Sequence, residues 1–357
     1  MAGGRKNMFL FRKRVWAILL AAVALVCTAC NSDEAENNDD KTYNSDVVVN
    51  SNDISDVNDD MAPSDEQKVE IKVGLVKNSA SVLGAAHLFA NSEDNSAYEK
   101  YTPVVYNTAD ELCAAFNNGE IATAVLPPDK AAICYDKSNC YVTAVTGGCN
   151  YYIAENGNTI NDIADLNGKT VTVSKEDTMS ENVLNVVAKN NGVSISYNQV
   201  ENNKALVDGI KNGSIKCAMM QEPYLSQVTS DSVRSAIDLD DSWNDATEQE
   251  MVTSCLVVNK NFVSEQAIPF GFFMKDYNAS ASMARRSTEE TAKVANKFAL
   301  ADDVDACKAA VPGCGVTFKT GTEMKEMLTA FYNQISAGNA NALGCQVPDD
   351  GFYFVNE

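Results

Sequence analysis

From residue 69 onward the sequence alternates short apolar runs with helical stretches, in two successive blocks. Apolar runs begin at Ile71 and Tyr101 in the first block, and at Thr170 and Cys217 in the second. Such alternation is typical of β-α units, whose strands pair into a mostly parallel sheet covered by helices. Beyond Phe262 the pattern is almost wholly helical. The sequence therefore predicts an α/β fold with two blocks of β-α units, closed by C-terminal helices.

Two short patterns mark expected helix starts. Thr108 with Glu111, and Thr178 with Glu181, have the spacing of a capping box. In this motif a hydroxyl and a carboxylate satisfy free backbone amides at the first turn. We therefore expect a helix to begin at each of these threonines.

The composition excludes several classes of function. The 357 residues include 28 Lys and Arg against 49 Asp and Glu, a net charge of -21, which disfavours binding to nucleic acid. The single histidine, His87, removes most zinc sites and most Ser-His-Asp arrangements. We expect no catalytic residues, no bound metal and no cofactor.

The first 30 residues predict an export signal. Five basic residues and no acidic residue accompany an apolar run over residues 15–26, which is too short to span a bilayer. The segment resembles a bacterial lipoprotein signal, in which a cysteine after a small residue is lipidated, and Cys30 fits that role. This predicts a lipid anchor on the extracytoplasmic face of the cell membrane. A plain secretory signal is the alternative.

The next segment, residues 31–66, predicts a disordered acidic linker. It contains twelve acidic residues, one basic residue and few large apolar residues. A segment with high charge and little to bury does not form a packed core. We expect it to hold the folded part of the chain away from the membrane.

Several motifs occur in a characteristic order between residue 69 and the end of the chain. They are GEIATA (119–124), DLNGKTV (165–171), Glu222-Pro223, GTEMK (321–325) and PDDGFYF (348–354). Their order and spacing resemble the substrate-binding proteins of bacterial ABC importers, in the branch that serves nitrate, sulfonate, taurine and thiamine-precursor uptake. The stretches 147–150 and 175–178 depart from that pattern.

The resemblance implies a type II periplasmic-binding-protein fold, in which two α/β lobes joined by two crossover segments close on a ligand. Lobe one would comprise residues 69–152 and 258–357, and lobe two residues 153–257. The crossovers would lie near residues 151–155 and 255–258.

The resemblance also implies a function without catalysis. The protein would capture a small solute, anionic or heterocyclic, and deliver it to the permease subunits of an ABC importer, acting as a monomer. Two other functions stay open: a surface sensor or adhesin of the same fold, and a lyase-type enzyme on this architecture.

Ligands of open α/β sheets bind beyond the carboxyl ends of the strands. This rule selects residues that follow the expected strands. The ligand-binding candidates are Asn78, Ser79, Ser81, Pro127, Asp129, Gly148, Cys149, Asp177, Thr178, Met179 and Glu222. Amides at helix starts bind anions, whereas the three acids would suit a cationic solute. The serines and Thr178 are equally candidates for simple helix caps.

Nine cysteines follow Cys27 and Cys30. The pairs nearest in sequence are Cys134 with Cys140 and Cys307 with Cys314. An exported protein can form disulfides, and buried free thiols can also serve as small apolar residues. The sequence is compatible both with disulfides and with buried free thiols.

Overall fold

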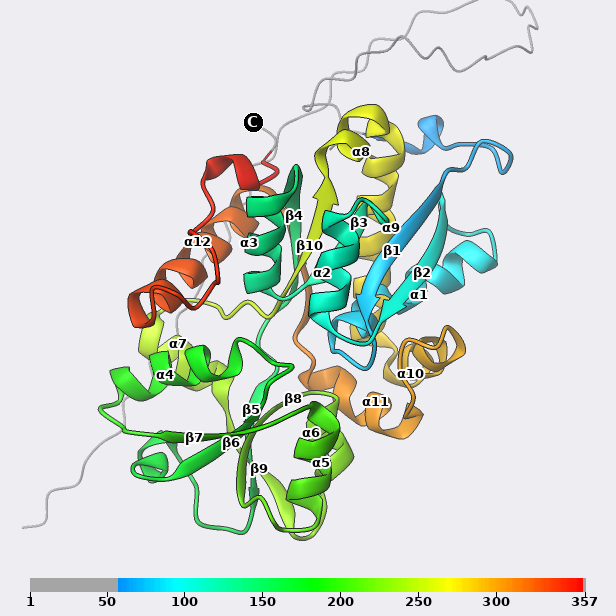
Figure 1. Ribbon diagram of the computed structural model, residues 1–357. Coiled ribbons are helices and arrows are strands. Elements are labelled where there is room, and N and C mark those ends of the chain that lie inside the picture. Colours follow the sequence, from blue (N-terminus) through cyan, green and yellow to red (C-terminus); the bar gives the residue numbers. More distant parts are fainter. Residues whose placement is uncertain (1–56, 356–357) are drawn as a thin grey trace, which may run out of the picture. The chain divides into compact units, whose positions relative to one another are not determined.

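The computed structural model describes residues 57–355, which form two lobes with one β-sheet each (Figure 1). The predicted signal peptide, Cys30 and residues 31–56 of the predicted linker lie outside the described residues. Within residues 57–355 no helix has both the length and the apolar composition needed to cross a membrane.

Lobe one contains a six-stranded mixed sheet. Across the sheet its strands are β11 (Val316–Lys319), β4 (Cys140–Gly147), β10 (Ser254–Asn259), β3 (Thr123–Leu126), β1 (Glu70–Val76) and β2 (Lys100–Tyr106). β1 pairs in parallel with β2 and β3, whereas β10 and β11 run antiparallel to their neighbours. Val73 and Leu75 of β1 are fully buried, as expected for a strand in a sheet that helices cover on both faces.

Helices cover both faces of this sheet, and each face has its own apolar cluster. One face is covered by α1 (Ser81–Glu93), α8 (Lys260–Glu265), α9 (Ala267–Arg286), α10 (Thr288–Lys297) and α11 (Val304–Ala310). The other is covered by α2 (Ala109–Asn117), α3 (Pro128–Lys137) and α12 (Gly321–Gly338). The capping box of Thr108 and Glu111 is present at the start of α2, which confirms that prediction.

Lobe two contains a five-stranded sheet. Across the sheet its strands are β7 (Ser196–Val200), β6 (Thr170–Ser174), β8 (Cys217–Gln221), β5 (Tyr151–Asn156) and β9 (Val233–Asp238). Its helices are α4 (Ser180–Asn190) and α7 (Leu239–Thr247) in one apolar cluster, and α5 (Asn203–Lys211) and α6 (Tyr224–Val228) in another. The first of these clusters continues into lobe one, where Phe331 of α12 packs against Trp243 of α7 with ring centroids 5.6 Å apart.

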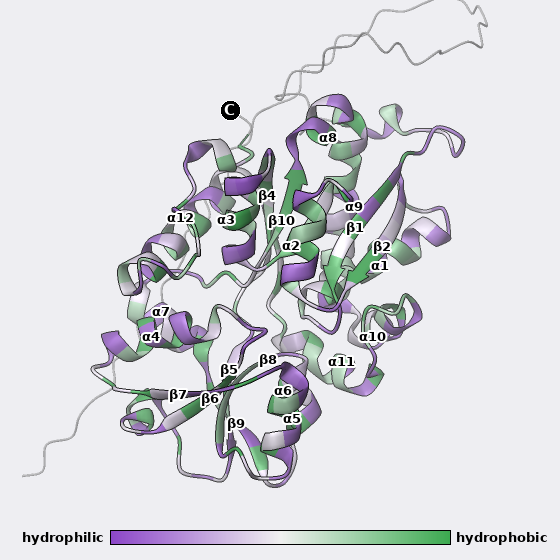
Figure 2. Ribbon diagram, in the orientation of Figure 1, coloured by the Kyte–Doolittle hydropathy of each residue, from purple (hydrophilic) through white to green (hydrophobic). Residues whose placement is uncertain are grey.

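The chain passes between the two sheets twice, through residues 148–150 and through residues 248–253. The predicted crossovers at residues 151–155 and 255–258 instead belong to strands β5 and β10. β10 lies within the lobe-one sheet, and Figure 2 shows that it is strongly hydrophobic. β10 pairs on both edges, so the crossover falls in residues 248–253, which precede it.

Two further expectations are corrected by tertiary contacts. The end of the predicted linker is ordered: Val57 is buried, and the Asp59 carboxylate accepts a hydrogen bond from Tyr98 Oη at 2.6 Å. In the C-terminal part expected to be helical, Val316–Lys319 forms strand β11. Four residues are too few to show a period in sequence, and pairing with β4 decides their conformation.

Candidate functional site

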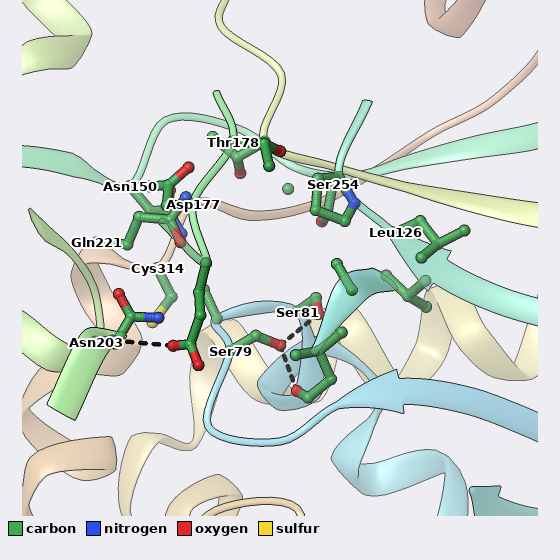
Figure 3. A pocket seen from close by; sticks show the side chains of 18 of the residues that line it. Ser79, Ser81, Leu126, Asn150, Asp177, Thr178, Asn203, Gln221, Ser254 and Cys314 are labelled. Atoms are coloured by element: carbon green, nitrogen blue, oxygen red, sulfur yellow. Dashed lines mark hydrogen bonds between the residues drawn. The ribbon is translucent and has the colours of Figure 1, made fainter. Parts of the chain in front are cut away.

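A cleft of about 850 Å³, counting the part open to solvent, lies between the two lobes. Both lobes line it at the carboxyl ends of their strands, near Val76 of β1, Leu126 of β3 and Gln221 of β8. This is where open α/β sheets bind ligands, because loops and helix starts converge there. Figure 3 shows side chains from both lobes facing this space.

The lobe-one wall is uncharged and rich in hydroxyl groups. Ser79 Oγ donates to the Val76 carbonyl oxygen at 2.7 Å and lies 2.8 Å from Ser81 Oγ, where α1 begins. Thr146 Oγ1 and Ser254 Oγ form a second hydroxyl pair, 2.9 Å apart. These four side chains present groups that can both donate and accept hydrogen bonds.

The lobe-two wall is acidic. Asp177 Oδ1 accepts hydrogen bonds from Tyr151 Oη at 2.9 Å and from the amides of Met179 and Ser180 at 3.2 Å. Burial raises the pKa of Asp177 to about 6 despite these bonds, because the charged form loses hydration. The neighbouring acid, Glu176, accepts a hydrogen bond from the Asn203 amide at 2.9 Å, at the start of α5.

One hydrogen bond joins the lobes next to the cleft. Thr178 Oγ1 of lobe two donates to Asp129 Oδ2 of lobe one at 2.5 Å. Asp129 is only 3% exposed, and burial raises the pKa of its carboxyl group. Its second oxygen, Oδ1, has no hydrogen-bond partner among residues 57–355.

The capping box predicted for Thr178 and Glu181 is therefore wrong. α4 begins at Ser180, and Asp177 supplies the acceptor for its first amides. A carboxylate is the stronger acceptor for those amides. The Thr178 hydroxyl is thus free to reach across to Asp129, and Glu181 accepts from Gln199 Nε2 instead.

Five of the eleven predicted ligand-binding residues line the cleft. They are Ser79, Ser81, Pro127, Asp177 and Thr178. The other six are not among the residues that line it: Asn78, Asp129, Gly148, Cys149, Met179 and Glu222.

Four of those six make contacts that account for their positions. Asn78 Nδ2 donates to Asp302, and the Gly148 amide donates to the Gly315 carbonyl oxygen at 2.7 Å. Met179 is buried at the start of α4, and Glu222 accepts hydrogen bonds from Ser226. Each therefore serves the lobe that contains it.

Several further residues line the cleft that were not predicted from the sequence. They include Asn107, Asn150, Tyr151, Glu176, Asn203, Gln221, Tyr224, Thr253 and Ser254. Gln221 is the last residue of β8 and lies one position before the predicted residue Glu222. Asn150 and Tyr151 lie at the first crossover, which was predicted near residues 151–155 and is found at residues 148–150. Asn203 has no signal in sequence beyond its place at a helix start.

Within residues 57–355 no group of three or more His, Cys, Asp and Glu side chains is placed to hold a metal ion. Among the cleft-lining residues between 57 and 355, the only charged side chains are those of Glu176 and Asp177. The site can therefore bind a solute through hydroxyl, amide, carboxylate and aromatic groups.

Comparisons with known proteins agree with this geometry. Residues 141–291 match the family model described as NMT1/THI5 like. No curated protein sequence gives a match. The fold is similar to that of an ABC transporter from Parabacteroides distasonis, with a TM-score of 0.66 and 19% identity over 79% of this chain and 98% of that one.

Two sulfonate-binding proteins have similar folds. The periplasmic aliphatic sulphonate-binding protein SsuA from Escherichia coli matches with a TM-score of 0.59 and 16% identity, over 74% of this chain and 92% of that one. The alkanesulfonate-binding protein SsuA from Xanthomonas axonopodis pv. citri, bound to MOPS, matches with a TM-score of 0.56 and 14% identity, over 75% and 93%. The expected periplasmic-binding-protein fold is thus confirmed, and residues 141–291 are similar to the NMT1/THI5-like family.

Proposed function

We propose that the protein is an extracytoplasmic solute-binding lipoprotein that captures a small molecule between its two lobes and delivers it to an ABC importer. The observation that carries this proposal is the cleft of about 850 Å³ lined by both lobes at the carboxyl ends of their strands. Two short chain segments connect the lobes, which also pack against each other at Phe331 and Trp243, and such segments allow the lobes to move relative to each other around a solute.

The sequence supports the extracytoplasmic location in this proposal. The basic and apolar start of the chain, followed by Cys30, fits a lipid-anchored protein, and the acidic residues after it suit a tether. The lobes would then stand outside the membrane, next to the permease subunits. We propose no catalytic step, because capture and release of a solute need only the two walls of the cleft.

Ligand-induced stabilisation tests the capture step. A solute that binds only the folded protein stabilises it by about 2.7 kcal/mol when its concentration is a hundred times Kd. We expect at least one small solute class to raise the melting temperature and to reduce the radius of gyration in X-ray scattering. A rigid particle that no solute stabilises or compacts would contradict the proposal.

Delivery to an importer needs a separate experiment. Deletion of the gene should abolish uptake of the bound solute, and a Cys30→Ala variant should restore little uptake because it is released from the cell surface. Conversion of the solute to a product by the purified protein, detected by mass spectrometry, would favour an enzyme instead. Binding to a protein partner without any solute would favour the sensor or adhesin.

A further inference from the structure

The charge of the cleft restricts which solute it can hold. Of the residues that line it, Glu176 and Asp177 alone carry a formal charge, and both are acidic. Lys130 and Lys175 line an adjoining pocket that shares Glu176 with the cleft, and both are paired with acids. Lys130 Nζ lies 2.6 Å from Asp110 and 3.8 Å from Asp129, and Lys175 Nζ lies 2.5 Å from Glu201. A sulfonate or other anion would therefore meet two like charges and no basic side chain in this wall.

The helix N-termini around the cleft offer an anion few free backbone amides. In lobe two, Asp177 accepts the first amides of α4, and Glu176 accepts the Asn203 amide of α5. In lobe one, α2 has a complete capping box, and α3 begins with Pro128, which follows Pro127 and like it has no amide hydrogen. Neither α1 nor α3 has a side-chain cap, and the first turn of α3 contains the acidic residue Asp129. At α2, α4 and α5, acidic side chains of the protein itself already face the positive end of the helix.

By contrast, several hydrogen-bond acceptors at the lobe-two wall have no donor among residues 57–355. Glu176 Oε1 and Asp177 Oδ2 accept no hydrogen bond from any residue between 57 and 355, although the other oxygen of each carboxylate does. Asn150 lies beside Asp177 in Figure 3 and is only 3% exposed. Its Oδ1 has no hydrogen-bond partner in the described part of the chain. A buried acceptor without a donor destabilises the protein unless a ligand supplies one.

Two aromatic rings complete this wall. Tyr151 and Tyr224 both line the cleft. Tyrosine faces attract cations through the negative potential of the ring, most strongly where water is displaced. Carboxylates, a free amide oxygen and tyrosine rings together form a site for a group that donates hydrogen bonds and carries positive charge.

We propose that the solute carries a protonated or quaternary amine, held at the lobe-two wall by Glu176, Asp177 and Asn150. This inference rests on the proposed function and names its substrate class. It sets the cleft apart from the sulfonate ligands named for the two SsuA proteins of similar fold. The hydroxyl groups of the lobe-one wall would contact the uncharged part of the solute.

The electrostatics of Asp177 agree with this assignment. Burial raises the pKa of its carboxyl group to about 6, and the negative charge of Asp129 adds to the shift, whereas Tyr151 opposes it by donating a hydrogen bond. A bound cation would favour the ionised carboxylate and lower this pKa again. Glu176 and Asp129 are the other carboxylates near Asp177, and in the described part of the chain no lysine, arginine or histidine lines the cleft, whereas Lys130 and Lys175 line the pocket next to it.

Four probes that share a benzyl or phenyl group test the charge directly: benzylamine, benzyltrimethylammonium, benzyl alcohol and benzenesulfonate. Each is added to the purified exported chain at equal concentration and ionic strength, and the melting temperature and Kd are measured. We expect both cations to stabilise the protein and the alcohol and sulfonate to leave it unchanged. Glu176→Gln and Asp177→Asn should each weaken binding of the cations by about tenfold or more.

Glu265→Gln is the matched control, since Glu265 is an exposed acid on α8 outside the cleft, and it should leave Kd unchanged. Glu176 is itself exposed, so its variant is expected to fold, which circular dichroism checks. Stabilisation by the sulfonate and not by the cations would overturn the inferred charge while leaving solute capture in place. Cation binding that survives both cleft variants would overturn the residue assignment. No stabilisation by any probe, together with none by a wider set of solutes, would count against both proposals.

Discussion

Thr178 of lobe two donates a hydrogen bond of 2.5 Å to the buried carboxylate of Asp129 in lobe one. This bond is made only when the two lobes approach each other, because Asp129 lies on α3 of lobe one and Thr178 lies between β6 and α4 of lobe two. It satisfies one oxygen of Asp129, and the other has no partner in the described residues. Thr178 therefore helps to hold the arrangement of the lobes seen in the structure.

Replacing Thr178 by valine should favour separation of the lobes. The change keeps the shape of the side chain and removes the donor, so the arrangement seen in the structure would leave the buried Asp129 carboxylate without this hydrogen bond, at a cost of about 1–3 kcal/mol. We expect a larger radius of gyration by X-ray scattering. Thr178→Ser keeps the hydroxyl and should behave like the wild type. Identical scattering from the valine and serine variants would contradict the role assigned to Thr178.

Asp177 should make the ligand-free protein less stable at neutral pH than in mild acid. The folded-state pKa of about 6 lies above the ordinary value of 3.8, so the folded state binds more protons between these values. The free energy of unfolding therefore falls as pH rises from about 4 through 6, and the penalty is complete above that range. Asp177→Asn keeps an acceptor for the α4 amides, so it should raise the free energy of unfolding at neutral pH by about 1–3 kcal/mol.

Urea unfolding of the wild type and of Asp177→Asn at several pH values measures this effect. The difference in the free energy of unfolding between the two proteins reports the contribution of Asp177 alone, because Asp129 and the other carboxylates are present in both. We expect the difference to disappear below about pH 4, where the carboxyl group is protonated in both states. A difference that does not vary with pH would show that the effect of the substitution is not electrostatic.

Gly315 should tolerate no side chain, because it packs against the first crossover. Its φ is +60°, and a Cβ atom there would lie 2.4 Å from the carbonyl oxygen of Cys149. Gly315→Ala should therefore cost the left-handed strain of about 1–2 kcal/mol and, in addition, a displacement of residues 148–150. Gly119 is the control, since its φ is +74° and nothing lies within 4 Å of its Cβ position. Urea unfolding should show a clearly larger loss for Gly315→Ala, and equal losses would contradict the close packing.

Cys113 and Cys134 should form a disulfide when the protein is oxidised. Their sulfur atoms, on α2 and α3, lie 3.0 Å apart, and neither predicted pair is the one in contact. A hydrogen bond from Cys134 lowers the pKa of the Cys113 thiol, which favours the reactive thiolate. A thiol oxidant such as diamide would take up the two electrons and two protons released. The bridge should stabilise the fold by about 3 kcal/mol.

Peptide mapping without reductant would reveal this bridge as a cross-linked pair of peptides. All nine cysteines of the described residues are free in the structure, so the reduced protein supplies the reference. Cys113→Ser should abolish both the cross-link and the gain in stability. Recovery of Cys113 and Cys134 as two alkylated thiols after oxidation would contradict the prediction.

The sequence alone determined the order of the elements and the class of fold. Periodicity and caps are local properties, so the β-α blocks and the capping box at Thr108 could be recognised from neighbouring residues. The same local rules placed Ser79, Pro127 and Asp177 at the ends of strands, where they line the cleft. Periodicity predicts short elements less well, and the four-residue strand β11 was not predicted.

Only the tertiary structure decided which polar groups meet. Thr178 has the sequence of a helix cap, yet it bonds to Asp129, because Asp177 takes the α4 amides and the facing lobe offers a buried carboxylate. The acidic character of the cleft depends on Lys130 and Lys175 pairing with acids outside the cleft lining, which no local pattern specifies. Hydrogen bonds and charges act over a few ångströms in space, whatever the separation along the chain, and the packing of the two sheets sets those distances.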